Sequence, residues 1–256
     1  MSSPPTAWDT MATWLDEKHQ DEGDLWHRAL IDPSVFRLLG PVTGQRVLEL
    51  ACGNGYLAHK LARLGAEVTA IDASPALIAL AKKRSARLQL AIAYHVADAA
   101  RIEVLLDGSF DVVVSNMALM DIEDAAGAIR EVARVLRTAG RFIASLSHPC
   151  FDVPNASAWV IERADFQTRV WRKTGRYRDA FKGSIPWQLA GPRGFHQTPA
   201  FHRPLSWYFR ALKDAGLVVA MLEEPVPTEE FIAKDPQGEW IAQIPLHVVL
   251  EARKEA

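Results

Sequence analysis

Apolar runs typical of β-strands alternate with helical patterns through most of this chain. The expected strands are 46–50, 67–71, 91–96, 110–115 and 140–147, with helices at 55–65, 75–87 and 122–137 between them. A strand–helix–strand order that repeats in this way predicts a doubly wound α/β fold, a mostly parallel sheet with helices on both faces. Ligands of such sheets bind at the carboxyl ends of the strands, so the residues that follow each strand are the candidates for a site.

Two regions lie outside the alternation of strands and helices, so the chain is expected to have three parts. Residues 1–40 are expected to form helices rich in tryptophan, and residues 148–203 contain many prolines and are expected to be irregular. After the irregular region come a helix at about 204–215 and strands at 217–223 and 244–252, which we expect to pair in antiparallel fashion. The predicted organisation is therefore an N-terminal helical segment 1–40, a core of 41–147 and 204–256, and an insert at 148–203.

Charge and composition exclude several kinds of protein. The net charge of −2 gives the whole chain no basic excess for gripping nucleic acid. No apolar run reaches the roughly 20 residues of a membrane span, and the first ten residues lack the layout of a signal peptide. With only Cys52 and Cys150, the chain has no disulfide framework, so a cytoplasmic location is the simplest expectation.

The stretch LELACGNGYLA, residues 48–58, carries the strongest motif. It places G-x-G-x-x-A directly after an expected strand, which is typical of a dinucleotide site, although a tight turn without a ligand fits the same letters. Glu49 argues against a dinucleotide, because a carboxylate near the end of this strand would repel a pyrophosphate. An acid there suits a ligand with a positive charge or with hydrogen-bond donors.

Polar residues also end the next strands. Asp72 can accept hydrogen bonds from both hydroxyls of a ribose, which dinucleotides and S-adenosylmethionine share. A helix cap is the alternative role for Asp72, but Ser74 is the better cap. Asp98 is placed to accept from an adenine amino group, and Asn116 ends the fourth strand beside the same cleft.

At these residues the sequence resembles the class I S-adenosylmethionine-dependent methyltransferases, in particular the methyltransferase-11-like group of small-molecule enzymes. The stretch VLELACGNGYLAHKLARLGAEVTAIDASPALIALAKKR is similar to the first two motifs of the family, ADAA to its adenine motif and FDVVVSNMALMDIED to its fourth-strand motif. The resemblance implies seven strands, with the last one antiparallel. It covers residues 8–150 well and the remainder in outline. One departure is Ala51, where the family often has glycine.

The resemblance implies S-adenosylmethionine as cofactor and S-adenosylhomocysteine as product, with no metal expected. The cofactor-binding residues that it implies are Trp14, Glu49, Ala51, Gly53, Gly55, Asp72, Ala73, Asp98, Ala99, Asn116 and Met117. The N-terminal helices are expected to cover the cofactor as a lid, with Trp26, His27 or Arg28 toward its methionine end. In the strand order of the family one strand separates Cys52 from Cys150, which is too far for a disulfide bond.

Methyl transfer requires a positioned nucleophile and a base only where that nucleophile must lose a proton. Among the histidines His148 is the best placed for this, because it directly follows the fifth strand; the alternative is a histidine that bonds only to backbone. Neither His148-x-Cys150 nor the pair His196 and His202 has the spacing typical of a zinc site.

The insert is expected to cover the acceptor. Residues 151–203 carry nine Lys or Arg and four Asp or Glu, a net of +5, with aromatic residues interleaved. This pattern fits a lid over a flat or carboxylated small molecule, with Arg169, Arg172, Arg176 or Arg193 as partners for a carboxylate. RNA binding and a solvated surface hairpin are the alternatives. For the whole chain, an NAD-dependent oxidoreductase, an RNA methyltransferase and a non-catalytic cofactor-binding regulator stay open, as does the oligomeric state.

Overall fold

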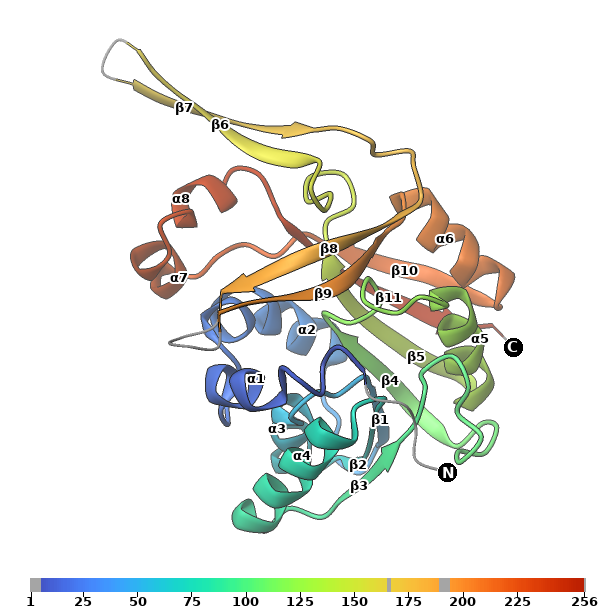
Figure 1. Cartoon of the computed structure of the whole chain (residues 1–256). Helices are drawn as coiled ribbons and strands as arrows, with labels where there is room; N and C mark the ends of the chain where they lie inside the picture. The colour runs from blue at the N-terminus through green and yellow to red at the C-terminus, as the bar shows by residue number, and fades with distance from the viewer. Residues whose placement is uncertain (1–5, 165–166, 189–193, 256) are drawn as a thin grey trace.

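A computed structural model describes residues 6–164, 167–188 and 194–255. Its centre is a seven-stranded sheet in the order β10-β11-β5-β4-β1-β2-β3 (Figure 1). The strands are β1 Arg46–Leu50, β2 Glu67–Asp72, β3 Ile92–Val96, β4 Phe110–Asn116, β5 Leu136–Ser147, β10 Leu217–Glu223 and β11 His247–Lys254. Strands β1 to β5 pair in parallel, and β11 is antiparallel to both β5 and β10. The predicted α/β fold with an antiparallel last strand is confirmed.

Helices cover both faces of the sheet, as its two-sided apolar strands require. The helices are α1 Ala12–His19, η1 His27–Ile31, α2 Asp32–Leu39, α3 Tyr56–Arg63, α4 Pro75–Leu88, α5 Ala125–Val135, α6 Leu205–Asp214, α7 Glu229–Lys234 and α8 Gly238–Ile241. Helices η1, α2, α3 and α4 contribute to the hydrophobic core on one face, and α5 and α6 to the core on the other. Ser74 caps α4 as expected, since its Oγ accepts from the N–H of Leu77 at 3.1 Å.

The insert contains more regular structure than its prolines predicted. It forms two antiparallel hairpins, β6 Ser157–Ala164 with β7 Gln167–Thr174, and β8 Phe181–Gln188 with β9 Phe195–His202. The prediction of an irregular segment was therefore wrong. A two-stranded ribbon has edges on both sides, so Pro186 and Pro199 interrupt no central ladder.

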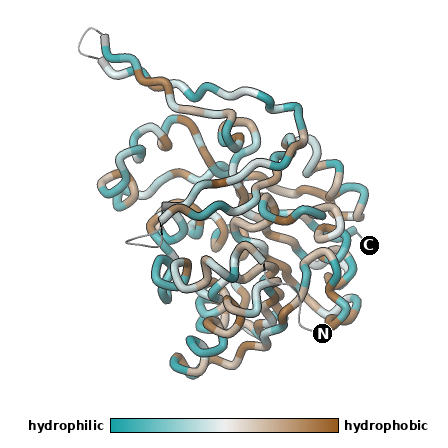
Figure 2. The backbone as a smooth tube through the Cα atoms, in the orientation of Figure 1, coloured by the Kyte–Doolittle hydropathy of each residue, from teal (hydrophilic) through white to brown (hydrophobic). Residues whose placement is uncertain are grey.

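The two hairpins lie differently on the molecule. The β6–β7 hairpin projects from the body, whereas β8–β9 runs across it toward the N-terminal helices (Figure 1). The hydropathy view shows hydrophilic residues along the outer helices and a short hydrophobic stretch on the projecting hairpin (Figure 2). Among the described residues, no helix has the length and apolar character needed to cross a bilayer.

One boundary between elements also differs from expectation. The helix expected at 122–137 ends at Val135, and β5 begins at Leu136 without a loop. The pairing of β4 with β5 shifts register between Phe110 and Val112, and Ala139 has a φ of +59°. This irregularity turns the chain directly from α5 into β5. The loop expected between them is therefore replaced by a distorted start of β5.

Candidate cofactor site

The carboxyl ends of β1, β2 and β4 meet where the strand order of the sheet reverses, beside the turn that follows β1. In this turn Ala51, Gly53 and Gly55 all have left-handed backbone, with φ of +56°, +56° and +76°. A left-handed conformation costs an alanine roughly 1–2 kcal/mol, which explains why glycine suits position 51.

The two glycines of the turn have different roles. A Cβ on Gly55 would lie 2.8 Å from the Tyr94 Oη and 3.0 Å from the Ala81 Cβ, so Gly55 is required for packing against β3 and α4. Among the described residues, a Cβ on Gly53 would meet only the Leu15 Cδ2 within 4 Å, at 3.5 Å. Gly53 is therefore the glycine that leaves room for a ligand at the backbone.

Glu49 is a buried acid with an unused oxygen. Its side chain is 2 % exposed, the N–H of Ala58 donates to it, and its Oε2 has no partner among the described residues. Burial raises the pKa of Glu49 well above its ordinary value, and the nearby charges of Asp72 and Asp32 raise it further. An unpaired buried carboxyl oxygen is costly, and a cationic donor from a ligand would satisfy it.

Asp72 closes the second strand beside the same turn. Its Oδ2 accepts from the N–H of Gly53 and its Oδ1 from the N–H of Ser74, both at 2.8 Å. Burial raises the pKa of this carboxyl group. Each carboxylate oxygen has two lone pairs, so both keep acceptor capacity for ribose hydroxyls. Ala73 follows and is exposed.

The end of β3 lies next to Asp72. The N–H of Ala97 donates to the Asp72 carbonyl oxygen at 3.0 Å, which fixes the position of the residues that follow. Asp98 is exposed and accepts from the N–H of Ala100 at 2.9 Å, while Ala99 is buried. The role of Asp98 and Ala99 at an adenine stays a prediction.

Asn116 ends β4 in a polar network that sequence reasoning missed. Its Nδ2 donates to the Tyr56 Oη at 2.6 Å and to the Asp32 Oδ1 at 3.2 Å, and its Oδ1 accepts from the Ser145 hydroxyl. Lys60 pairs with the other oxygen of Asp32 at 3.0 Å. Asp32 belongs to the N-terminal helices, so no local pattern in the sequence identifies it.

Met117 continues from Asn116 in an unusual backbone conformation. It has a φ of +54°, and its N–H donates to the carbonyl oxygen of Ser145 at 3.0 Å and to the hydroxyl of the same residue at 2.9 Å. These bonds offset the strain and hold Met117 and Asn116 at the end of β4. Such backbone strain is typical of functional turns.

The N-terminal segment packs on the glycine-rich turn and on the start of α4. The Asp9 Oδ1 accepts from the Ser74 hydroxyl at 2.5 Å and from the N–H of Ala76 at 3.2 Å. Helix α1 brings Leu15 to Gly53, whereas the ring of Trp14 lies against Trp187 of β8 with centroids 5.4 Å apart. Leu15 of α1 therefore lies beside Gly53, and a contact between Trp14 and the cofactor stays a prediction.

The three residues expected near the methionine end of the cofactor make different contacts. His27 contacts the Tyr56 ring at 5.3 Å, so it joins the network around Asn116. Trp26 packs on Phe231 at 5.0 Å, and Arg28 forms an exposed ion pair with Glu230 at 2.7 Å.

His148 is buried and held by two hydrogen bonds. Its Nδ1 accepts from the N–H of Cys150 at 3.1 Å, so its Nε2 carries the proton and donates to the Glu224 Oε1 at 3.0 Å. Burial lowers the pKa of the ring, and Glu224 opposes this effect. Both nitrogens are therefore engaged within the protein. Cys150 and Cys52 are free, with β4 between the strands that precede them.

A cavity of about 230 Å³ opens beside the end of β5. Ser147 and Pro149 line it, while the intervening His148 does not. Its other walls come from the β4–α5 loop, the insert and α6, and include Met120, Arg172, Phe201, Arg203 and Tyr208.

Two arginines line this cavity, and both already have partners. Arg172 bonds to the Phe151 carbonyl oxygen and the Asp152 carboxylate, each at 2.7 Å. Arg203, which was not among the expected candidates, bonds to the carbonyl oxygens of Ile122 and Glu123. Arg169 and Arg176 are exposed, and Arg193 lies outside the described residues.

The sheet order, the glycine-rich turn after β1 and the acids that end β1 and β2 define a class. A family model described as a methyltransferase domain matches residues 48–144, and the chain is similar to the class I S-adenosylmethionine-dependent methyltransferases. The resemblance noted from the motifs is thereby confirmed.

Particular relatives extend the comparison. A ubiquinone biosynthesis O-methyltransferase of Xanthomonas oryzae pv. oryzae is 34 % identical over 143 residues, which are 55 % of this chain and 58 % of that protein. The chain thus spans less than two thirds of the curated relatives that it matches. A crystal structure of an S-adenosylmethionine-dependent methyltransferase from Mesorhizobium loti has 28 % identity and a TM-score of 0.70, covering 87 % of this chain and 96 % of that one. A putative methyltransferase from Listeria monocytogenes shares the fold, with 22 % identity, a TM-score of 0.70 and coverage of 91 % and 97 %.

Proposed function

We propose that this protein transfers a methyl group from S-adenosylmethionine to a small-molecule acceptor. The observation that carries the proposal is the unpartnered, buried Oε2 of Glu49, whose carboxyl group senses the nearby charge of Asp72. A cofactor with a sulfonium and an ammonium group is complementary to such an acidic cleft. A pyrophosphate would be repelled there, which argues against the NAD-dependent alternative.

Each residue of the cleft would contact a different part of the cofactor. Asp72 would accept from the ribose hydroxyls, Glu49 would face the ammonium group, and Asp98 with Ala99 would hold the adenine. Asn116 and Met117 would lie toward the sulfonium, which supplies an already activated methyl group. The task of the chain is then to align an acceptor and to exclude water, and alignment alone contributes about 7–11 kcal/mol.

The cavity beside β5 is the proposed acceptor site. A dry cavity of about 150 Å³ holds a benzene ring, so a cavity of 230 Å³ suits a substituted single ring. The relative that acts in ubiquinone biosynthesis is named an O-methyltransferase, which supports a hydroxyl as the methylated group. Because Arg172 and Arg203 already have partners, a carboxylate on the acceptor would have to compete with them.

An acceptor hydroxyl must lose its proton. We retain His148 as a proposed base, which requires its unprotonated Nδ1 to be released from the N–H of Cys150. Asp121 is a second candidate, because its Oδ1 has no partner among the described residues and burial raises its pKa to about 8. Burial also raises the pKa of Tyr208, a residue that lines the cavity, while the nearby Arg203 opposes this effect.

The nature of the partners follows from the same features. We propose a small molecule rather than nucleic acid as acceptor, because the basic residues of the insert that face the cavity are already bonded within the protein. The free cysteines are consistent with a cytoplasmic location, which remains our proposal.

Calorimetric titration of the purified chain tests the cofactor. S-Adenosylhomocysteine should bind with 1:1 stoichiometry and NAD should not bind. Asp72→Ala should weaken binding by about 5- to 150-fold, because buried ribose hydroxyls would lose an acceptor worth about 1–3 kcal/mol. Asp107→Ala, at a largely exposed carboxylate, is the matched control and should leave affinity unchanged. Binding of NAD in place of S-adenosylhomocysteine would refute the assignment, and binding without turnover across acceptors with one ring would favour a regulator.

A further inference from the structure

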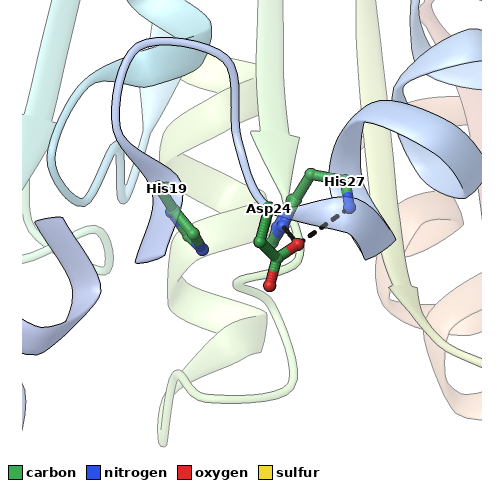
Figure 3. A group of neighbouring side chains, drawn as sticks. All are labelled: His19, Asp24 and His27. Atoms are coloured by element: carbon green, nitrogen blue, oxygen red, sulfur yellow. Dashed lines mark hydrogen bonds and ion pairs between the residues drawn. The ribbon is translucent and has the colours of Figure 1, made fainter. Parts of the chain in front are cut away.

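Three side chains of the N-terminal segment form a cluster apart from the proposed cofactor contacts. His19 ends α1, Asp24 lies in the following turn and His27 begins η1 (Figure 3). One potential ligand atom from each lies within 4.8 Å of the other two. Two imidazoles and one carboxylate are a common ligand set for divalent transition metals.

The fold holds these groups together independently of any ligand. The His27 Nδ1 lies 2.8 Å from the Asp24 Oδ1, and the rings of His19 and His27 meet edge to face with centroids 4.6 Å apart. Both rings also contact Tyr56 at 5.3 Å. A Cβ on Gly23 would lie 2.8 Å from the Tyr56 ring, so only glycine lets the turn pack this tightly.

A fourth polar group lies beside the cluster. Asn54 is fully buried, and its side chain interacts with the His19 ring. Its Nδ2 donates to the Asp16 carboxylate at 3.0 Å, while its Oδ1 has no partner among the described residues. Asn54 belongs to the glycine-rich turn, between Gly53 and Gly55. A buried amide oxygen without a donor is costly and marks a position where a cation would be stabilised.

We propose that His19, Asp24 and His27 bind one divalent transition metal ion of the Zn²⁺ type, with the Asn54 Oδ1 or a water molecule completing the site. Ligand atoms around tetrahedral Zn²⁺ lie about 3.4 Å apart, so the widest separation in the cluster needs a contraction of at most about 1.4 Å. The metal would join α1 and η1 to the glycine-rich turn. By ordering the segment that covers the turn, it would raise the affinity for the cofactor.

Metal binding can be measured without turnover. The full chain, treated with EDTA and dialysed, should bind one equivalent of Zn²⁺ in calorimetry. Co²⁺ should give the visible absorption of a four-coordinate site. His19→Ala/His27→Ala should weaken Zn²⁺ binding by more than about tenfold, whereas His95→Ala, at a partly exposed histidine of β3, should not.

The Asp24→Asn variant distinguishes a loss of metal binding from a loss of folding. The side-chain oxygen of the introduced asparagine can still accept from the N–H of His27, as Asp24 does at 3.0 Å, but it lacks the charge of a good metal ligand. This variant should keep the melting temperature of the metal-free protein and lose most of the Zn²⁺ affinity. If it or the double variant binds Zn²⁺ as tightly as the wild type, the site is refuted.

The effect of the metal on the affinity for the cofactor is measured separately. Zn²⁺ should increase the affinity for S-adenosylhomocysteine in the wild type and not in Asp24→Asn. An equal increase in both proteins would overturn the proposed coupling. The metal-free wild type should bind S-adenosylhomocysteine regardless, so failure of the metal proposal is distinguishable from failure of the proposed function.

Discussion

At the scale of single residues, the site combines groups that are unfavourable in the protein alone. Glu49 is buried with one oxygen unpartnered, and Ala51 and Met117 have left-handed backbone. Each feature costs folding free energy, so each is expected to be retained for binding rather than for stability.

Glu49→Gln tests this at position 49. Because the pKa of Glu49 is raised in the folded protein, its contribution to stability is fully present below the ordinary value of 4.5 and is lost as the pH rises through the raised value. Glutamine does not titrate, so the cofactor-free variant should match the wild type near pH 4.5 and melt at a higher temperature at pH 8. Its affinity for S-adenosylhomocysteine should fall by at least about tenfold, because the ammonium group loses its counter-charge.

The control for this experiment is Glu67→Gln, at the exposed first residue of β2. It should change neither the pH dependence of melting nor the affinity. A Glu49→Gln variant that melts lower than the wild type at every pH would show that Glu49 is a structural residue.

At the scale of elements, the N-terminal segment and the β8–β9 hairpin support each other. Trp187 of β8 contacts Trp8 at 6.3 Å and Trp14 at 5.4 Å, and the Thr10 hydroxyl is 2.9 Å from the His196 Nε2 of β9. Two segments about 180 residues apart in sequence thus form one cover. We therefore expect the order of the N-terminal segment, which packs on the glycine-rich turn, to depend on the insert.

Trp187→Ala should loosen the N-terminal segment. Loss of two aromatic pairs, each worth about 0.5–1.5 kcal/mol, should speed hydrogen exchange in residues 8–19 and weaken binding of S-adenosylhomocysteine. Trp171→Ala, at a tryptophan of β7 that is 43 % exposed, is the matched control and should change neither measurement. Unchanged exchange in the Trp187 variant would show that the two segments are independent.

At the scale of the whole molecule, the β6–β7 hairpin stands apart from the body (Figure 1). Val160, Ile161 and Trp171 are each more than a third exposed on it. Its base is anchored, since the Trp159 Nε1 donates to the Gln237 Oε1 at 2.6 Å and Arg172 lies over the Trp159 ring. The anchor and the wall of the cavity thus lie at the base of the hairpin.

Replacing residues 161–170 with a short glycine-containing turn should therefore be tolerated. The melting temperature should change by less than about 2 °C and the affinity for S-adenosylhomocysteine should not change, because Trp159 and Arg172 remain. Differential scanning calorimetry and calorimetric titration provide both values. A loss of several degrees would mean that the projecting hairpin packs on the body in solution.

The sequence by itself determined the sheet, its helices, the class of protein and most residues near the glycine-rich turn. These follow from short-range signals: the period of apolar residues, the cap at Ser74, and motifs in which a strand end and the next turn are adjacent in the chain. The same local reading missed the four strands of the insert, because two-stranded ribbons carry no strong apolar alternation and accept proline.

Only the tertiary structure decided how distant residues meet. Asp32 reaches Tyr56 and Asn116 because the N-terminal helices pack on the end of the sheet, and His19 meets His27 because Tyr56 and Gly23 set the turn between them. His148 bonds to Glu224 while its neighbours Ser147 and Pro149 line the cavity. The direction of a side chain after a strand depends on which long-range partner its backbone meets, and no local pattern specifies that partner.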